Sequence, residues 1–172
     1  MKKILILPIL LFLVSCGATQ VNYDYDKEID FSNYTTYNYF SDINTGLSEL
    51  DTKRLLHAME ITLKAKGLLF SEEPDFLINI QGNSYQAAKN NTVGIGVGGG
   101  RNVSGGVSVG IPVGKAKLER KITFDFVDAK RDILFWQANS ISSYKENLTP
   151  EVREQKLQEL VNKVFDKYPV IR

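Results

Sequence analysis

Cysteine and histidine are almost absent from this chain of 172 residues, which contains one of each, Cys16 and His57. A disulfide within the chain needs two cysteines, so none can form. Zinc and related metals are held mainly by cysteine and histidine ligands, which scattered carboxylates do not replace. Catalytic schemes that pair a serine or cysteine nucleophile with a histidine base would have to rely on the single histidine. We therefore expect no disulfide, no metal site and no cofactor.

A strong excess of one charge is missing as well. The 21 lysines and arginines nearly balance the 20 aspartates and glutamates, which gives a formal net charge of +1. Proteins that bind nucleic acid through its phosphates need a basic surface, so no nucleic-acid partner is expected. Hydrophobic residues make up 43% of the chain, which is too many for a disordered protein. The length fits one domain with its own core.

Long apolar runs are also missing, with one short exception at the N-terminus. This run covers residues 4–14 and follows Lys2 and Lys3. About 20 apolar residues are needed to cross a bilayer, so the run is too short for a membrane span. A basic start, a short apolar stretch and small residues before a cleavage point are typical of a secretory signal. We predict a signal peptide over residues 1–15.

The only cysteine ends the motif Leu13-Val14-Ser15-Cys16, which is similar to a bacterial lipobox. In that class of signals the thiol is diacylated, the chain is cut before the cysteine, and the new amine is acylated. An ordinary cleavage site favours a small residue where Leu13 stands. Two or three acyl chains anchor a protein stably, whereas one chain binds a membrane only marginally. We predict a membrane anchor at Cys16, followed by a tether over residues 16–32.

Three aspartates in the predicted tether, Asp24, Asp26 and Asp30, suggest a calcium loop. An EF-hand loop also needs a glycine at its turn and a glutamate at its end, and both are missing here. We expect instead a solvated, partly strand-like segment that leads into a single domain over residues 33–172.

Two segments have the apolar spacing of helices that cover a core. The first spans residues 50–66, with Ser48 or Asp51 as its N-cap and Gly67 after its end. The second follows Thr149-Pro150, a cap and a first-turn proline. The expected apolar sides are Leu55, Leu56, Met59 and Leu63 in the first helix, and Leu157, Leu160, Val161, Val164 and Tyr168 in the second.

Four segments read as strands because they are rich in β-branched and aromatic residues or alternate between apolar and polar residues. They cover residues 34–40, 75–81, 118–128 and 133–143, and the last two flank a turn and predict a hairpin. The residues expected to face the core are Phe76, Ile78, Ile80, Ile122, Phe124, Phe126, Leu134, Trp136 and Ala138.

The segment 92–114 is unusually rich in glycine and valine. Residues 94–99 match the pattern G-x-G-x-x-G, but a dinucleotide site needs a strand before this pattern and a helix after it. Valine or isoleucine alternates with glycine instead, which predicts a flexible hairpin that extends the sheet. Such an edge is a candidate surface for strand addition by a partner, and the alternative is a mobile surface hairpin without any partner. The candidate partner residues are Gly94, Gly96, Gly98, Gly106 and Gly110.

Together these elements predict an α+β fold of order β-α-β-β-β-β-α. Alternating strands with one apolar face favour a mostly antiparallel sheet with one wet face. Two helices would cover the other face and complete a two-layer α/β sandwich.

No residue combination indicates catalysis. His57 shares the polar side of its helix with Lys53 and Glu60, so we interpret it as a surface residue. Asp125 and Asp128 are the remaining candidates for a carboxylate pair, but charged residues on a wet sheet face need no catalytic explanation. We expect a protein that is not an enzyme.

Several motifs follow one another in a recognisable order: the lipobox, Tyr23-Asp-Tyr-Asp26, Asp30-Phe31-Ser32 with Tyr34-Thr-Thr-Tyr37, Lys66-Gly67, Pro74-Asp75-Phe76-Leu77, the glycine-valine tract, Phe124-Asp-Phe-Val-Asp128-Ala-Lys, Leu134-Phe-Trp136, and Tyr168-Pro169. This order resembles a family of bacterial lipoproteins catalogued as domain of unknown function 4136. The resemblance implies an envelope lipoprotein with an α/β fold and carries over no catalytic residue. One departure is Tyr39-Phe40, near which the family pattern has a tryptophan.

We therefore expect a lipoprotein in the envelope of a Gram-negative bacterium, attached through Cys16 and acting as a non-enzymatic binding or accessory module. Gly17 after the cysteine resembles lipoproteins that are forwarded to the outer membrane, facing the periplasm. The partner would be another envelope protein, which would contact the wet sheet face or the glycine hairpin. Binding of a small ligand or glycan on a platform of Tyr34, Tyr37 and Tyr39 is the alternative, and an envelope hydrolase is the least favoured hypothesis.

Overall fold

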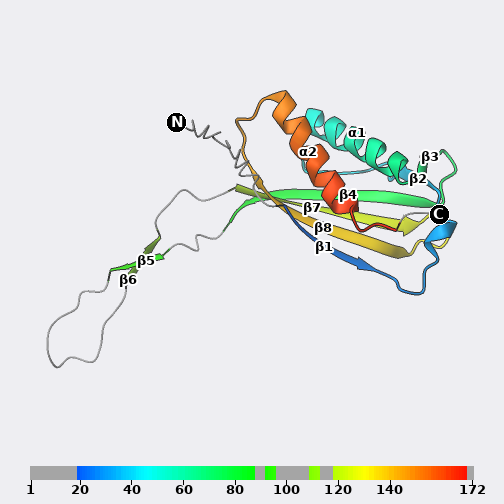
Figure 1. Ribbon diagram of the computed structural model, residues 1–172, viewed down its shortest axis with the longest axis horizontal. Helices are drawn as coiled ribbons and strands as arrows, with labels where there is room; N and C mark the ends of the chain where they lie inside the picture. Colours follow the sequence, from blue (N-terminus) through cyan, green and yellow to red (C-terminus); the bar gives the residue numbers. More distant parts are fainter. Residues whose placement is uncertain (1–18, 88–91, 96–108, 113–117, 170–172) are drawn as a thin grey trace, which may run out of the picture.

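The computed structural model describes residues 19–87, 92–95, 109–112 and 118–169, and its main layer is a six-stranded sheet (Figure 1). The strands lie in the order β1-β8-β7-β4-β2-β3. The neighbouring pairs β1–β8, β8–β7 and β7–β4 are antiparallel, whereas β2 runs parallel to both β4 and β3. The bounds are Gln20–Tyr25 (β1), Thr36–Tyr39 (β2), Leu69–Phe70 (β3), Phe76–Gln86 (β4), Leu118–Asp128 (β7) and Leu134–Tyr144 (β8).

Two helices, α1 (Glu49–Ala65) and α2 (Pro150–Phe165), lie side by side across one face of this sheet (Figure 1). The Ser48 hydroxyl accepts a hydrogen bond from the Asp51 amide and caps α1, and the Thr149 hydroxyl caps α2 in the same way. After α1 the chain turns at Gly67, whose φ of 85° favours glycine. The predicted α+β fold with two helices packed on one face is confirmed.

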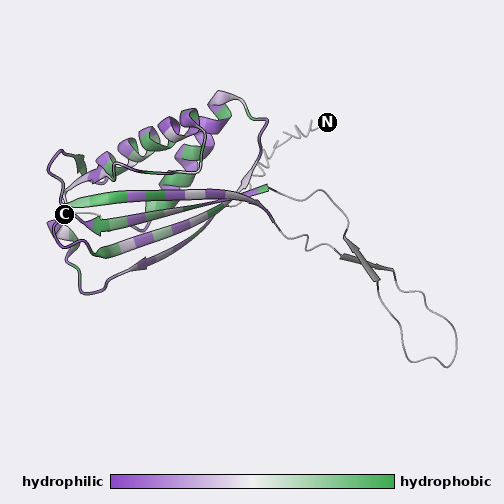
Figure 2. Ribbon diagram, turned by 180° about the vertical axis from the view of Figure 1, so that it is seen from behind, coloured by the Kyte–Doolittle hydropathy of each residue, from purple (hydrophilic) through white to green (hydrophobic). Residues whose placement is uncertain are grey.

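The core fills the space between the helices and the covered face of the sheet. In β7, the buried residues Ile122, Phe124 and Phe126 alternate with polar residues that point away from the helices. The same alternation is visible along the long strands in Figure 2. The predicted core residues of β4 and of both helices are also buried, except Leu56, which is half-buried: Phe76, Ile78, Ile80, Leu55, Met59, Leu63, Leu157, Leu160, Val161, Val164 and Tyr168.

A β-bulge changes which residues of β8 enter the core. Phe126 pairs with Trp136, but the next pair is Val127 with Leu134, so Phe135 is an extra residue. Phe135 and Trp136 are 1% and 2% exposed, whereas Leu134 is 51% exposed. The prediction that Leu134 faces the core is therefore wrong. It assumed strict alternation along the strand, and the extra residue of the bulge turns Leu134 to the opposite face.

The N-terminal strand differs from the predicted tether over residues 16–32. Gln20–Tyr25 forms β1, which pairs with β8 along its whole length. The Tyr23 side chain packs against the core, and its hydroxyl donates a hydrogen bond to the Lys163 carbonyl oxygen in α2 (2.9 Å). The sheet therefore begins four residues after Cys16, which itself lies outside the described residues, as do residues 1–15.

The glycine segment contributes a separate pair of strands. Thr92–Ile95 (β5) pairs antiparallel with Val109–Pro112 (β6), with Gly94 opposite Gly110. Within the described residues these strands form a sheet of their own, away from the six-stranded sheet (Figure 1). The hairpin-like pairing agrees with the predicted period of two, but the pair does not extend the main sheet as we expected.

Candidate functional site

The sheet face opposite the helices is open and polar, and its side chains bond to one another. Thr123 Oγ1 donates to Asn139 Oδ1 (2.8 Å), and Asn139 Nδ2 donates to Gln137 Oε1 (3.0 Å). Gln137 Nε2 in turn donates to Asp125 Oδ1 (2.7 Å). The strand register adds polar neighbours on both sides, and we call the whole set the open face: Asn22, Asp24, Asn79, Gln81, Thr123, Asp125, Gln137 and Asn139.

A cleft of about 550 Å³ lies at one border of the open face. It is lined by Asn79, Gln81 and Gly82 of β4 and by the loop that follows β2. Amide and carboxylate side chains supply both hydrogen-bond donors and acceptors here. The lining residues from the loop are Phe40, Asp42 and Asn44.

The floor of this cleft depends on two glycines that allow the loop to touch β4. A Cβ atom on Gly82 would clash with the Thr45 carbonyl oxygen, and one on Gly46 would clash with the Gly82 carbonyl oxygen. Gly46 also has a φ of 64°, which favours glycine. Asn44 and Gln81 form a β-bridge beside this contact. Backbone packing therefore fixes the position of the loop side chains at the cleft.

The tyrosines of the predicted aromatic platform do not form an exposed surface. Tyr34 and Tyr37 are 4% and 2% exposed, and Tyr39 is half-buried. Tyr34 stacks on Phe135 with ring centroids 4.1 Å apart, and Tyr37 lies edge-on to Tyr39. The platform hypothesis is therefore wrong, because these rings belong to the core.

A second polar cleft, of about 410 Å³, contains the buried carboxylate of Asp128. Asp128 accepts hydrogen bonds from the Tyr34 hydroxyl and the Arg131 Nε (both 2.8 Å), and from the backbone amides of Lys130 and Arg131. Burial alone would raise the pKa of Asp128, but these bonds outweigh it and hold the pKa well below its usual range. The carboxylate therefore stabilises the turn between β7 and β8.

Asp75 lies in the same cleft and is equally engaged. Its Oδ2 accepts bonds from the amides and hydroxyls of Thr35 and Thr36, at 2.9–3.1 Å. Burial alone would raise the pKa of Asp75, but these bonds lower it. Asp75 thus fixes the start of β2 against β4.

The remaining predicted residues lie apart from these clefts. His57 is exposed on α1, with its Nδ1 atom 3.9 Å from Glu60 Oε2. Of the candidate hairpin glycines, Gly94 and Gly110 face each other in β5 and β6. Cys16, Gly96, Gly98 and Gly106 lie outside the described residues.

Among the residues that the structure describes, no group of three or more histidine, cysteine, aspartate or glutamate side chains has an arrangement that could hold a metal ion. Neither helix there has the length and apolar content needed to cross a bilayer.

Comparison with known families decides the classification. A family model described as "Domain of unknown function (DUF4136)" matches residues 21–170. The chain belongs to the DUF4136 family. The match begins within β1, in agreement with the position of this strand in the sheet. No curated protein matches the chain.

Two solved structures share the fold of this DUF4136 domain at low sequence identity. A PDZ domain protein from Parabacteroides distasonis superimposes with a TM-score of 0.55 at 16% identity, over 90% of this chain and 38% of the other. The chain thus spans well under half the length of that protein. The PelC dodecamer from Paraburkholderia phytofirmans gives a TM-score of 0.52 at 10% identity, over 86% of this chain and 95% of the other.

Sequence reasoning named the motifs of the DUF4136 domain but did not bring them together. The structure places Asp30, Tyr34, Asp75 and Asp128, which belong to three separate motifs, around the cleft of about 410 Å³. No local sequence pattern indicates that these residues lie together, because the contacts between them join distant segments, as the bond between Tyr34 and Asp128 does across 94 positions. The cleft beside Gly82 was also missed, since its signal is one glycine in an otherwise regular strand.

Proposed function

We propose that this DUF4136 protein is a non-enzymatic accessory lipoprotein of a Gram-negative cell envelope, which binds an envelope protein through its open face. The observation that carries the proposal is the difference between the two sides of one sheet. The helices cover one side, while the other presents bonded amides, hydroxyls and carboxylates. A polar protein surface of this kind offers many hydrogen bonds to a partner.

The membrane anchor in the proposal rests on the lipobox that ends at Cys16. Because β1 starts at Gln20, the acylated residue would sit only four residues from the sheet. Gly17 supports an outer-membrane location that faces the periplasm. Such a short link would hold the domain close to the membrane surface and restrict which partners it can reach.

The proposal that the protein is not an enzyme is supported by the state of two hydrogen-bonded carboxylates, Asp75 and Asp128. A general acid that works near neutral pH needs a raised pKa. Hydrogen bonds lower the pKa of Asp75 and Asp128 instead, and each bond has a structural role. Neither carboxylate is therefore suited to donate a proton.

The glycine hairpin is a second proposed contact. Gly94 and Gly110 lie in strands that are outside the main sheet, so a partner strand could add to their edge. PelC, which shares the fold, is a dodecamer, so further copies of this chain are among the proposed partners.

Two measurements on cells that express the tagged full chain test this proposal. Radiolabelled palmitate should enter the wild-type protein and not a Cys16→Ala variant. Affinity purification after crosslinking should recover a defined envelope protein, and Cys16→Ala should lose it. A labelled protein that recovers only envelope background would contradict the accessory role.

A glycan ligand is the second candidate, and the cleft beside Gly82 favours it. Asn44, Asn79 and Gln81 can donate and accept hydrogen bonds with sugar hydroxyls, and Phe40 gives the cleft one aromatic wall. Binding of cell-wall fragments should then be lost in Gln81→Ala and retained in Lys64→Ala, a substitution on α1. Equal binding by both variants would rule out this cleft.

A further inference from the structure

The end of the domain nearest to the proposed anchor can be located from the strand register. Gln20 pairs with Ile141 of β8, and β8 ends three residues later at Tyr144. Cys16 precedes Gln20 by four residues, which span at most about 14 Å when fully extended. The membrane surface would therefore lie close to the end of β8, and we call this part of the domain the anchor end.

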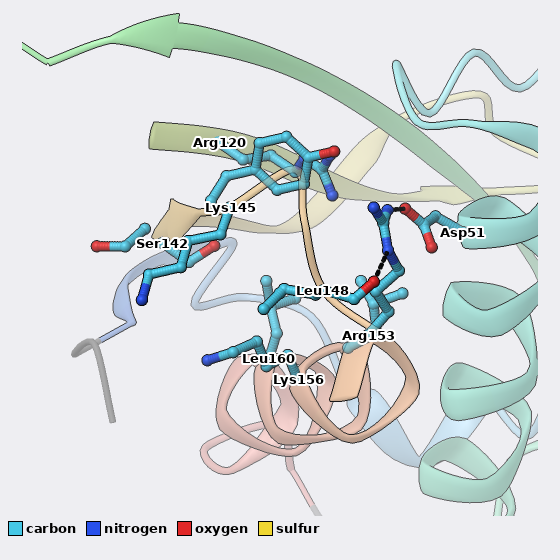
Figure 3. A pocket seen from close by; sticks show the side chains of 11 residues that line it. Asp51, Arg120, Ser142, Lys145, Leu148, Arg153, Lys156 and Leu160 are labelled. Atoms are coloured by element: carbon cyan, nitrogen blue, oxygen red, sulfur yellow. Dashed lines mark hydrogen bonds and ion pairs between the residues drawn. The ribbon is translucent and has the colours of Figure 1, made fainter. Parts of the chain in front are cut away.

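A small basic pocket opens at the anchor end (Figure 3). Four cationic side chains and one carboxylate line it, and they come from four parts of the chain. Arg120 comes from β7, Lys145 follows β8, and Arg153 and Lys156 come from α2. Such a concentration of positive charge is unexpected in a chain whose formal net charge is only +1.

The one carboxylate does not cancel this charge, because it is already paired. Asp51 is 2% exposed, and its two oxygens bond to Arg54 and Arg153 (2.8 Å each). Arg153 Nε also donates to the Leu148 carbonyl oxygen, which ties the loop before α2 to the pocket. This ion pair fixes one wall of the pocket and leaves the exposed Lys145 and Lys156 to face an incoming group.

Of the remaining cations, Arg120 is held in place by its neighbours, whereas Lys145 and Lys156 are free to contact a ligand. The Arg120 guanidinium carbon lies 3.6 Å from the centre of the Tyr144 ring, so a cation–π contact orients this side chain. Lys145 and Lys156 are exposed, extend from one side of the pocket in Figure 3, and have no hydrogen bond or ion pair within the described residues. Glu119, the nearest acidic neighbour on β7, lies on the open face and bonds to Tyr85.

We propose that this pocket binds the phosphate of an anionic lipid headgroup in the membrane that holds the acylated Cys16. The inference rests on the proposed anchor. The pocket has a volume of about 50 Å³, which suits a group of a few heavy atoms rather than a metabolite. Lysine and arginine near a bilayer are attracted to anionic lipids, and an acyl anchor combined with a basic patch binds more stably than either alone. The contact would orient the domain on the membrane and keep its open face accessible.

The test compares lysine reactivity in the acylated full-length protein, purified from membranes and reconstituted into vesicles. One vesicle type contains phosphatidylcholine alone, and the other also contains phosphatidylglycerol. An amine-reactive, membrane-impermeant reagent is added, and mass spectrometry gives the rate at each lysine. Lys27 and Lys64, which are exposed and lie away from the pocket, serve as internal controls.

Lys145 and Lys156 should react about fivefold more slowly on the anionic vesicles, the factor that corresponds to about 1 kcal/mol of contact per cation. The rates at Lys27 and Lys64 should stay equal on both vesicle types. Equal rates at the pocket lysines, or a uniform slowing of all four lysines, would overturn the inference.

Excess inorganic phosphate added to the neutral vesicles distinguishes a lipid headgroup from free phosphate as the ligand of the pocket. Protection of Lys145 and Lys156 by free phosphate as strong as that by the anionic lipid would overturn the headgroup assignment in favour of a soluble anion. The mass of the purified protein reports the anchor independently. A chain without acyl groups would overturn the proposed anchor together with this inference, whereas an acylated chain with unprotected lysines would overturn the inference alone.

Discussion

The two faces of the sheet are built from the same strands and differ in almost every other respect. In β7, Phe124 is fully buried under the helices, and its neighbour Thr123 bonds to Asn139 on the open face. Removing a buried ring leaves a cavity, whereas removing a surface hydroxyl leaves water to take its place. The covered face therefore determines the stability of the domain, and the open face is available for binding.

The largest loss of stability should come from removing a large side chain from the covered face. Phe124→Ala should lower the free energy of unfolding by about 3–5 kcal/mol, because the ring is buried against Phe165 and its neighbours. Thr123→Ala, one residue away, should cost less than about 1 kcal/mol. Urea unfolding of both variants checks the contrast. Similar losses for the two substitutions would mean that the faces do not differ in this way.

Gly82→Ala should have the next largest effect, because Gly82 is on the covered side at a backbone contact. The new Cβ atom would clash with the Thr45 carbonyl oxygen, so the loop must move, at a cost of about 2–3 kcal/mol. Gly67→Ala is the matched control, since it meets no atom within 4 Å and carries only the strain of its positive φ. Thermal unfolding of both variants measures the difference. A smaller loss for Gly82→Ala than for Gly67→Ala would show that the loop contact is adaptable.

Asp128→Asn should cost about 1–2 kcal/mol at neutral pH, because the amide replaces a carboxylate that accepts bonds from Arg131 and Tyr34. The folded-state pKa of Asp128 is below its value in the unfolded chain, so its contribution is complete above the unfolded pKa. That contribution is lost as the pH falls below about 4, toward the folded pKa. Unfolding curves at several pH values should therefore converge for the two proteins in acid. A gap that stays constant down to the lowest pH would contradict this role.

The smallest effect should come from the open face itself. Asn139→Ala removes two side-chain hydrogen bonds that are partly exposed to water, so stability should change by less than about 1 kcal/mol. Partner recovery in the crosslinking experiment should nevertheless fall. A large loss of stability would instead mean that the hydrogen-bonded amides of the open face stabilise the fold.

The sequence predicted those elements whose signals are local. Both helices, their caps at Ser48 and Thr149, and the alternation in β4 and β7 agree with the structure to within five residues at each end. Each of these features depends on spacing or on a capping residue within one segment. The fold class therefore followed from the pattern.

The missed features depend on contacts between distant segments. β3 has only two residues and no sequence signal of its own, and the sequence predicts the segment of β1 as a solvated, partly strand-like lead-in rather than as a strand of the main sheet. Phe135 enters the core through a bulge that alternation cannot reveal. The alternative ligand hypothesis places Tyr34 on an aromatic platform, yet Tyr34 is buried and bonds to Asp128 across 94 positions. Candidate sites were harder to predict than strands because they form where such segments meet.

Site-specific photocrosslinking in cells tests the central claim most directly. A photoreactive amino acid is placed at Gln81 or Asn22 on the open face, or at His57 on the exposed side of α1 as the control. The account predicts one crosslinked envelope partner from both open-face positions and none from His57. Crosslinks of equal yield from His57, or none from the open face while the protein is acylated and folded, would contradict it.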